Sequence, residues 1–304
     1  MINTLTSSDP EGVLFCPERP AYRQMIRLCA FDLDGTLLDP HGRLSPGNAG
    51  AVVELSESGT VIALISGRPP CYTGGFFHQL GICGFTAASN GAFISGPEGD
   101  IIRFDPFPEQ LTAQITSLLD ENGARYALQT VNGIIGNKEA SSSISERFIN
   151  YCSMVSSFGI DTRLPLTDPI IGGRAVPGVL KIAVTGGSLP LQDYQAAISS
   201  AFPSLTVSFS GATVLDINLP GNSKGNALEM ICSHLGVSRD DVCSFGDYNN
   251  DIPMFRSSGI SFAMGNAGDA VKSEADHITA PNYDDGVAEA IRRTLLPLNN
   301  EVSE

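Results

Sequence analysis

The sequence predicts an α/β fold in which a doubly wound parallel sheet forms a core and an α+β domain is inserted into it. Two observations predict the core: short apolar runs end abruptly in polar residues, and helical patterns separate one run from the next, as in buried parallel strands joined by helices. A third observation predicts the insertion. Between residues 93 and 219 the pattern changes to hairpins mixed with helices, which is typical of an antiparallel sheet.

The first half of the core is predicted from two strands and the helix between them. An apolar run at 25–31 ends in Asp32-Leu33-Asp34-Gly35-Thr36, and a second run at 61–65 ends in Ser66-Gly67-Arg68. Ser45-Pro46 begins the intervening helix, because serine is a favoured N-cap and proline is tolerated in the first turn. Ligands of doubly wound sheets bind outside the carboxyl ends of the strands, so both polar loops are candidate binding loops.

The inserted segment is predicted to contain two hairpins, further strands and several helices. Its clearest signal is Asn132-Gly133, a dipeptide that favours a two-residue hairpin turn. The predicted hairpins are 93–95 with 101–104 and 126–131 with 134–135; the further strands are 179–184, 205–209 and 214–219, and the helices lie near 111–119, 145–156 and 189–201.

The α/β alternation returns after Pro220-Gly221. An apolar run at 242–245 ends in Gly246-Asp247, so a third polar loop is predicted at the same edge of the sheet. The remaining predicted elements are helices near 225–235, 267–272 and 287–295 and strands at 260–264 and 277–279. The predicted organisation is therefore an N-terminal extension at 1–24, a core at 25–92 and 220–304, and an inserted cap domain at 93–219.

The composition excludes several classes of function. The net charge is −15 and the isoelectric point about 4.6, so the chain lacks the basic footprint that binds nucleic acid or an anionic membrane. No apolar run approaches the length of a membrane span. The seven cysteines include no Cys-x-x-Cys pair, which favours reduced thiols and a cytoplasmic protein. An acidic protein that binds an anion needs local positive charge, from a metal or from basic side chains.

Asp32 and Asp34 are the first candidate catalytic residues. Two carboxylates one residue apart suit a hard cation such as Mg²⁺. Asp32 can also attack phosphorus, and Asp34 can protonate a leaving group and later deprotonate water. The alternative is a solvated turn, since Asp and Gly are common turn residues. Ser66 and Gly67 can hold a phosphoryl oxygen and Arg68 can add charge, although Ser-Gly is also ordinary loop chemistry.

Two later segments contribute further candidates. Lys224 stands where a helix begins, which is unfavourable for a cation, so an anion such as a phosphoryl group or Asp32 is expected beside it; the alternative is a surface lysine. Asp247, Asn250 and Asp251 offer oxygen ligands for magnesium, or else form an acidic loop that caps the next helix. These segments all fall at predicted strand ends or at a helix start, so we predict that they converge on one crevice.

These motifs resemble those of the haloacid dehalogenase-like hydrolases and, more narrowly, of the Cof-type phosphatases, in which a Rossmann-like core carries a large α/β cap. The resemblance extends over about residues 25–295. The segments that carry it are Phe31–Leu38, Ile65–Arg68, Ser89–Ala92, Lys224–Leu228, Phe245–Met254, Ala263–Ala267 and Asn282–Val287.

The resemblance implies a role for each motif residue. Asp32 is the nucleophile, Asp34 the acid and base, and Lys224 the cation that neutralises the phosphoryl charge and orients Asp32. The residues implied to contact the substrate phosphate are Thr36, Ser66 and Gly67, with Arg68 and Asn90 as further polar candidates. Those implied to hold Mg²⁺ are Asp32, the backbone carbonyl of Asp34, and Asp247, with support from Asn250 and Asp251.

We therefore expect a Mg²⁺-dependent phosphatase that hydrolyses small phosphorylated metabolites through an aspartyl-phosphate. Hexose phosphates are the expected substrates, with pyridoxal phosphate and flavin mononucleotide as alternatives. Two other functions stay open: a phosphomutase or phosphotransferase that hands the same phosphoryl group to a sugar, and a non-catalytic regulator that binds sugar phosphates. Dehalogenase chemistry shares the fold but does not need the metal cluster that Asp34, Asp247 and Asp251 imply.

Overall fold

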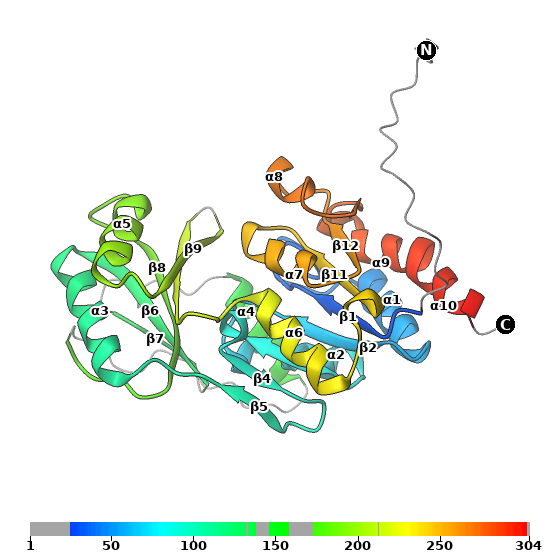
Figure 1. The fold of residues 1–304 in the computed structure, drawn as a ribbon, viewed down its shortest axis with the longest axis horizontal. Helices are drawn as coiled ribbons and strands as arrows, with labels where there is room; N and C mark the ends of the chain where they lie inside the picture. The colour runs from blue at the N-terminus through cyan, green and yellow to red at the C-terminus, as the bar shows by residue number, and fades with distance from the viewer. Residues whose placement is uncertain (1–24, 132, 138–145, 158–172, 212, 303–304) are drawn as a thin grey trace, which may run out of the picture.

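The computed structural model describes residues 25–131, 133–137, 146–157, 173–211 and 213–302. Two β-sheets organise this part of the chain (Figure 1). The first sheet has eight strands, which in spatial order are β13 (His277–Ile278), β12 (Ile260–Ala263), β11 (Val242–Gly246), β1 (Leu28–Phe31), β2 (Val61–Ile65), β3 (Phe85–Ala88), β4 (Phe93–Ser95) and β5 (Ile101–Phe104).

Strand β1 lies where the order of the first sheet reverses. The chain adds β2 and β3 on one side of β1 and later adds β11, β12 and β13 on the other, and all of these neighbours are parallel. Strands β4 and β5 continue the sheet in antiparallel orientation. Doubly wound sheets bind ligands at such a reversal point, so the residues that follow Phe31 occupy the favoured position.

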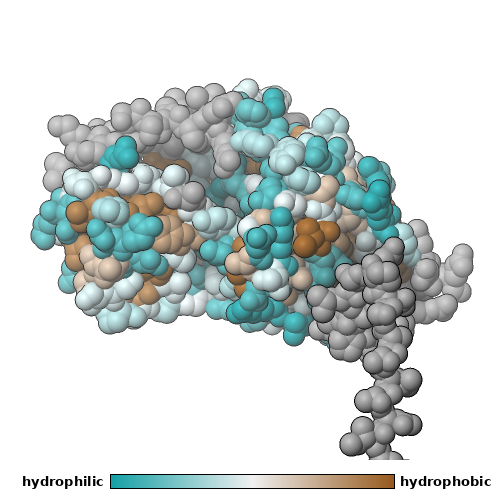
Figure 2. Space-filling view, turned by 90° about the horizontal axis from the view of Figure 1, so that it is seen from above, coloured by the Kyte–Doolittle hydropathy of each residue, from teal (hydrophilic) through white to brown (hydrophobic). Residues whose placement is uncertain are grey.

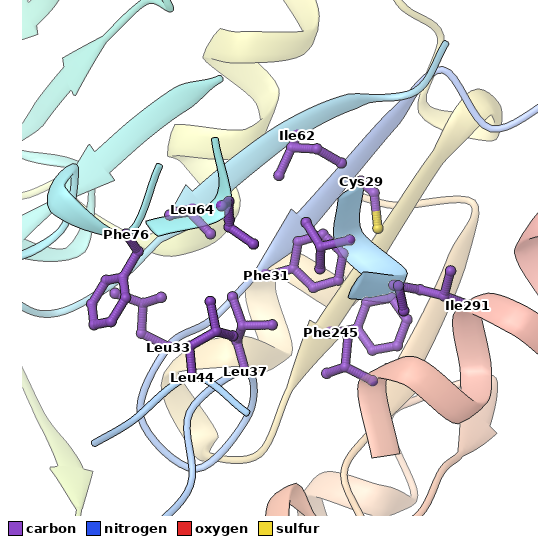
Figure 3. Packing of buried hydrophobic residues seen from close by; sticks show 14 of the residues in the cluster. Cys29, Phe31, Leu33, Leu37, Leu44, Ile62, Leu64, Phe76, Phe245 and Ile291 are labelled. Atoms are coloured by element: carbon purple, nitrogen blue, oxygen red, sulfur yellow. The ribbon is translucent and has the colours of Figure 1, made fainter. Parts of the chain in front are cut away.

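Alternate residues of β1 pack into two different layers of helices. Cys29 and Phe31 belong to one apolar cluster, whereas Leu28 and Ala30 belong to another. In the first cluster the rings of Phe31 and Phe245 stack with their centroids 5.0 Å apart (Figure 3). Because apolar clusters cover both of its faces, strand β1 is fully buried. The helices of the first layer are α1 (Pro46–Glu57), α2 (Gly75–Leu80), α9 (Gly286–Ala290), the π-helical turn Ile291–Leu295 and α10 (Leu296–Val302); those of the second are α6 (Lys224–Leu235) and α7 (Ile252–Arg256), and α8 (Asp269–Lys272) follows β12.

The second sheet is antiparallel and has one face covered by helices. Its strands in spatial order are β7 (Gly133–Gly136), β6 (Ala124–Thr130), β8 (Val179–Gly187), β10 (Val214–Asn218) and β9 (Thr206–Gly211). Tyr126, Ile182 and Leu215 of this sheet pack with Ile115 of α3 (Glu109–Glu121) and Ile198 of α5 (Leu191–Ala201). The opposite face of the second sheet is turned toward the first sheet (Figure 1).

Helix α4 (Glu146–Ser156) comes from the inserted segment but packs on α2, one of the helices that cover the first sheet. Its residues Tyr151 and Val155 are buried in the same apolar cluster as Phe76 of α2. The Tyr151 hydroxyl donates a hydrogen bond to the carbonyl oxygen of Cys71 at 2.8 Å. At Gly75 the two helices are so close that an added Cβ would lie 2.5 Å from that hydroxyl. Helix α4 is therefore attached to the core layer.

The structure confirms the predicted fold class, a parallel α/β core with a separate antiparallel sheet. The hairpin predicted at 93–95 and 101–104 forms, but it pairs with β3 and extends the first sheet. Proximity explains this, because a short turn at 89–92 brings β4 back beside β3. Strand β3 and helix α2 were not predicted, because they span four and six residues, too few to display a period. The predicted extension at 1–24 lies outside the described residues, and the domain boundaries stay a prediction.

The surface of the described residues is mixed in character. On the face seen in Figure 2, hydrophilic and hydrophobic residues are interspersed over both halves of the molecule. Every described helix is too short or too polar to cross a bilayer.

Candidate active site

A cavity of about 580 Å³ lies between the two sheets at the carboxyl end of β1. The core lines it with residues from each predicted loop, among them Asp32, Ser66 and Asp247. The second sheet lines it with Gln129 and Lys181. The second sheet thus contributes part of the wall of the candidate site.

Lys224 joins two carboxylates at the centre of the site. Its amine lies 2.6 Å from Oδ1 of Asp32 and 2.6 Å from Oδ1 of Asp251, and the side chains of all three are almost fully buried. The second oxygen of Asp251 accepts hydrogen bonds from the backbone N–H groups of Asp247 and Tyr248, each at 3.0 Å. Asp251 therefore fixes both the amine and the loop. These two carboxylates also offset the unfavourable position of a cation at the first residue of α6.

Asp247 lies close to Asp32 and is oriented by Thr36. The Thr36 hydroxyl donates a hydrogen bond to Oδ1 of Asp247 at 3.1 Å, so this hydroxyl faces the acidic group. Gly35 permits the close approach of the two loops: its φ is +86°, and an added Cβ would lie 2.2 Å from Oδ2 of Asp247. A side chain at position 35 would occupy the space of the carboxylate.

Burial and the repulsion of nearby carboxylates raise the pKa of Asp32 and of Asp247. Burial raises the pKa of Asp32 well above its usual range, and repulsion from Asp251 and Asp247 adds to this, although Lys224 opposes it. Burial and repulsion from Asp251 likewise raise the pKa of Asp247, to about 7. Burial alone would lower the pKa of Lys224, but its ion pairs with Asp251 and Asp32 raise it instead. The site holds more negative charge than Lys224 balances.

This surplus of carboxylate charge fits a divalent cation. Oxygens of Asp32, Asp247 and Asp251 lie within 4.8 Å of one another. Hard oxygen donors are the ligands that Mg²⁺ prefers, and a dication would offset the repulsion that raises the two pKa values. Because Asp251 already uses both oxygens on Lys224 and backbone N–H groups, Asp32 and Asp247 are the better placed ligands. Asn250 lines the cavity, and within the described chain no hydrogen bond links its side chain to these carboxylates.

Asp34 is held by Arg68. The guanidinium donates from Nε to Oδ2 of Asp34 at 2.6 Å and from Nη2 to Oδ1 at 2.8 Å. The guanidinium carbon also lies 5.6 Å from the ring centroid of Phe76 and 6.0 Å from that of Tyr151, a stacking arrangement that stabilises a cation. Burial lowers the pKa of Arg68, but Asp34 more than restores it. The predicted acid and base thus sits in a fixed position beside Asp32.

The loop after β2 is connected to a left-handed turn at 89–91. Ser89 and Asn90 have φ of 49° and 57°, and Gly91 follows with φ of 89°. The backbone N–H of Ser89 donates to the carbonyl oxygen of Arg68 at 2.7 Å, and that of Asn90 donates to the carbonyl oxygen of Ser66 at 3.1 Å. Left-handed non-glycine residues are strained and cluster at functional sites. The Asn90 amide nitrogen donates to Asp216 and Asn218, whereas its Oδ1 lies 3.1 Å from the position of a Cβ added to Gly67.

The inserted segment brings to the site residues that were not predicted from the sequence. Lys181 and Asp216 form a buried ion pair at 2.7 Å, and Tyr151 lines the cavity. One signal was available: a single lysine in the apolar run 179–184 and a single aspartate in the run 214–217. Charged residues are rarely buried unless they are paired, so two such interruptions indicate a partner for each.

Comparison with known proteins gives consistent matches over most of the chain. A family profile described as haloacid dehalogenase-like hydrolase matches residues 29–291. The pyridoxal phosphate phosphatase YbhA of Escherichia coli is 28% identical over 272 residues, which are 89% of this chain and 99% of that protein. The 5-amino-6-(5-phospho-D-ribitylamino)uracil phosphatase YcsE of Bacillus subtilis is 26% identical over 89% of this chain and 96% of its own. A solved haloacid dehalogenase-like hydrolase from Bacteroides thetaiotaomicron has a TM-score of 0.73 and 24% identity, and covers 88% of this chain and 98% of its own.

Proposed function

This chain belongs to the haloacid dehalogenase-like hydrolase family, in which it is a phosphatase of small phosphorylated metabolites, and we propose that it works with Mg²⁺ through an aspartyl-phosphate, the acyl phosphate formed on Asp32. The observation that carries the proposal is the place of Asp32. It is 4% exposed, follows the central strand at the reversal point of the sheet, and lines the cavity. Lys224 engages Oδ1, which leaves Oδ2 for attack on phosphorus.

The first half of the reaction transfers the phosphoryl group to Asp32. A carboxylate oxygen of Asp32 forms a bond to phosphorus, the bond between phosphorus and the ester oxygen breaks, and the leaving oxygen takes a proton from Asp34. Ser66 and the backbone N–H of Gly67 bind the phosphoryl oxygens. Lys224 and Mg²⁺, held by Asp32 and Asp247, supply the positive charge that phosphoryl transfer requires.

The second half releases phosphate and restores Asp32. Asp34 takes a proton from water, the water oxygen bonds to phosphorus, and the bond between phosphorus and Asp32 breaks. In both halves Asp34 carries the proton for part of the cycle. A protonated carboxyl group is a weaker acceptor than a carboxylate, so protonation of Asp34 weakens its two hydrogen bonds from the guanidinium of Arg68.

The proposal is tested by phosphate release from phenyl phosphate. The wild type is assayed with Mg²⁺ and with EDTA, beside Asp32→Asn and a matched aspartate control, Asp193→Asn, on the exposed side of α5. We expect EDTA to abolish release, Asp32→Asn to lower kcat by about 10³-fold or more, and the control to keep full activity. An Asp32→Asn protein that keeps a tenth of the activity would exclude the covalent route.

The same assay separates phosphatase from phosphotransferase. It contains no sugar acceptor, so release of inorganic phosphate shows that water accepts the group. Activity that appears only when a sugar is added would assign the chain to the phosphotransferases. The metabolite panel that follows includes hexose phosphates, pyridoxal phosphate and flavin mononucleotide, because relatives act on phosphate esters of sugars, pyridoxal and a ribityl compound.

A further inference from the structure

Lys181 is a buried lysine of the second sheet whose amine reaches the loop after β2. It is 3% exposed and lines the same cavity as Asp32. A Cβ added to Gly67 would lie only 3.3 Å from Nζ of Lys181. The lysine therefore crosses from one sheet to the other and ends directly above the residues proposed to bind the phosphoryl group.

The register of the second sheet places Lys181 in a polar row. Gln129 of β6 lies directly opposite Lys181 of β8, so both side chains are on one face. Asp216 of β10 lies opposite Ala183, the next residue of β8 on that face. The intervening Ile182 points to the other face, into the cluster under α3 and α5. Successive side chains of a strand point to opposite faces of the sheet. Because one face packs against α3 and α5, the polar row lies on the face toward the cavity.

Asp216 fixes the lysine without using up its donors. The Lys181 amine donates to Oδ2 of Asp216 at 2.7 Å, and the Asn90 amide donates to the same oxygen at 2.9 Å. Among the described residues, the Lys181 amine donates a hydrogen bond to Asp216 alone. An ammonium group has three N–H donors, so two of them remain for a molecule in the cavity.

We propose that Lys181 is a specificity-determining residue, which donates hydrogen bonds to an oxygen of the leaving group while Asp216 and Asn90 position its amine. This proposal rests on the phosphatase function proposed above. It assigns the recognition of the leaving group to the polar face of the second sheet, opposite the carboxylates that react with the phosphate.

The charges of the site favour an uncharged leaving group. Carboxylates in or directly behind the cavity outnumber the basic side chains by two, and one bound divalent cation would balance this difference. The phosphate of the substrate then adds negative charge, so a second anionic group would be repelled. Lys181 is already neutralised by Asp216 and therefore suits a hydroxyl or carbonyl oxygen. The carboxylates are Asp32, Asp34, Asp216, Asp247 and Asp251, and the basic residues are Arg68, Lys181 and Lys224.

The test compares esters that do and do not carry such an oxygen. Glucose 6-phosphate, ribose 5-phosphate and pyridoxal 5′-phosphate carry one, and phenyl phosphate does not. Lys181→Met leaves Asp216 buried without its cation, so Lys181→Met/Asp216→Asn is made as well; the asparagine oxygen still accepts from Asn90. Lys272→Met, in α8, is the matched lysine control. We expect kcat/KM for the best oxygen-bearing ester, relative to phenyl phosphate, to fall about 10- to 100-fold in both variants and to be unchanged in the control.

Binding provides a second readout that needs no turnover. Dissociation constants for the same esters are measured by calorimetry, with Mg²⁺, in an Asp32→Asn background with and without the Lys181 changes. The same loss of preference is expected there. If the wild type releases phosphate from no ester, the phosphatase function fails, and the binding ratio still decides the role of Lys181. The assignment is overturned if a folded double variant keeps the ratio within twofold in both readouts, or if the wild type prefers phenyl phosphate to all three oxygen-bearing esters.

Discussion

The raised pKa of Asp247 makes the stability of the metal-free protein depend on pH. A carboxyl group whose pKa is higher in the folded than in the unfolded chain stabilises the fold when protonated, and this contribution is lost as the pH rises. For Asp247 the folded value is about 7 and the ordinary value 3.8, so the loss extends from about pH 4 to pH 7. A difference of about three units corresponds to roughly 4 kcal/mol in all, of which about 2–3 kcal/mol falls between pH 5 and pH 8.

The perturbation that isolates this effect is Asp247→Asn in EDTA. An amide resembles the protonated carboxyl group and cannot ionise. The variant therefore does not lose this stability as the pH rises. We therefore expect the variant to become more stable than the wild type as the pH rises from 5 to 8. At about 2–4 °C per kcal/mol, the difference in Tm between variant and wild type should widen by roughly 4–12 °C over this range.

The assay is thermal unfolding at pH 5 and pH 8, with EDTA and then with Mg²⁺. A bound dication replaces the proton as the compensating charge, so Mg²⁺ should raise the wild-type Tm more at pH 8 than at pH 5 and should raise that of the variant less. A Tm difference that stays constant with pH in EDTA would refute the reasoning. So would a wild type that gains stability over the variant as the pH rises.

Three further substitutions follow from the packing of the site. Lys224→Met leaves two buried carboxylates without their cation, and should lower the free energy of unfolding by about 3–5 kcal/mol in urea titration at pH 7; an unchanged midpoint would contradict the central role of the amine. Gly35→Ala places a Cβ 2.2 Å from Oδ2 of Asp247 at a left-handed φ, so kcat/KM should fall at least about tenfold through displacement of that carboxylate, and a fully active variant would show that the loops can separate. Tyr151→Phe removes the hydroxyl that donates to Cys71 and should cost about 1 kcal/mol in urea titration, whereas Tyr151→Ala also removes the ring from the core and should cost about 3–5 kcal/mol; equal effects would mean that the ring contributes little.

The catalytic loops could be predicted because their positions depend on local pattern. Asp32, Ser66 and Asp247 each follow an apolar run, and parallel strands bring their carboxyl ends to one edge whatever the rest of the chain does. Lys224 follows the same logic, since a cation at a helix start indicates an anion nearby. In the structure all four of these residues line one cavity.

The contacts made by the inserted segment could not be predicted, because they depend on register and on docking between distant elements. Lys181 meets Asp216 through the pairing of β8 with β10, and no local pattern gives that register. Asn90 stays a predicted substrate ligand, and the hydrogen bond from its amide nitrogen to Asp216 joins two distant segments that no local pattern connects. The hairpin of β4 and β5 shows the same limit: its strands were recognisable, but the sheet that they join is decided by a turn of a few residues.

The attachment of α4 has a consequence for how the chain folds and for how it can be divided. An insertion usually folds by itself, so that its removal leaves the host intact. Here the insertion supplies Tyr151 and Val155 to the interior of the host, against Phe76 and over Gly75. A host made by joining residue 92 to residue 220 would contain a void where these side chains lie and would expose the helix that they cover. We therefore expect the two parts of the chain to unfold as one cooperative unit.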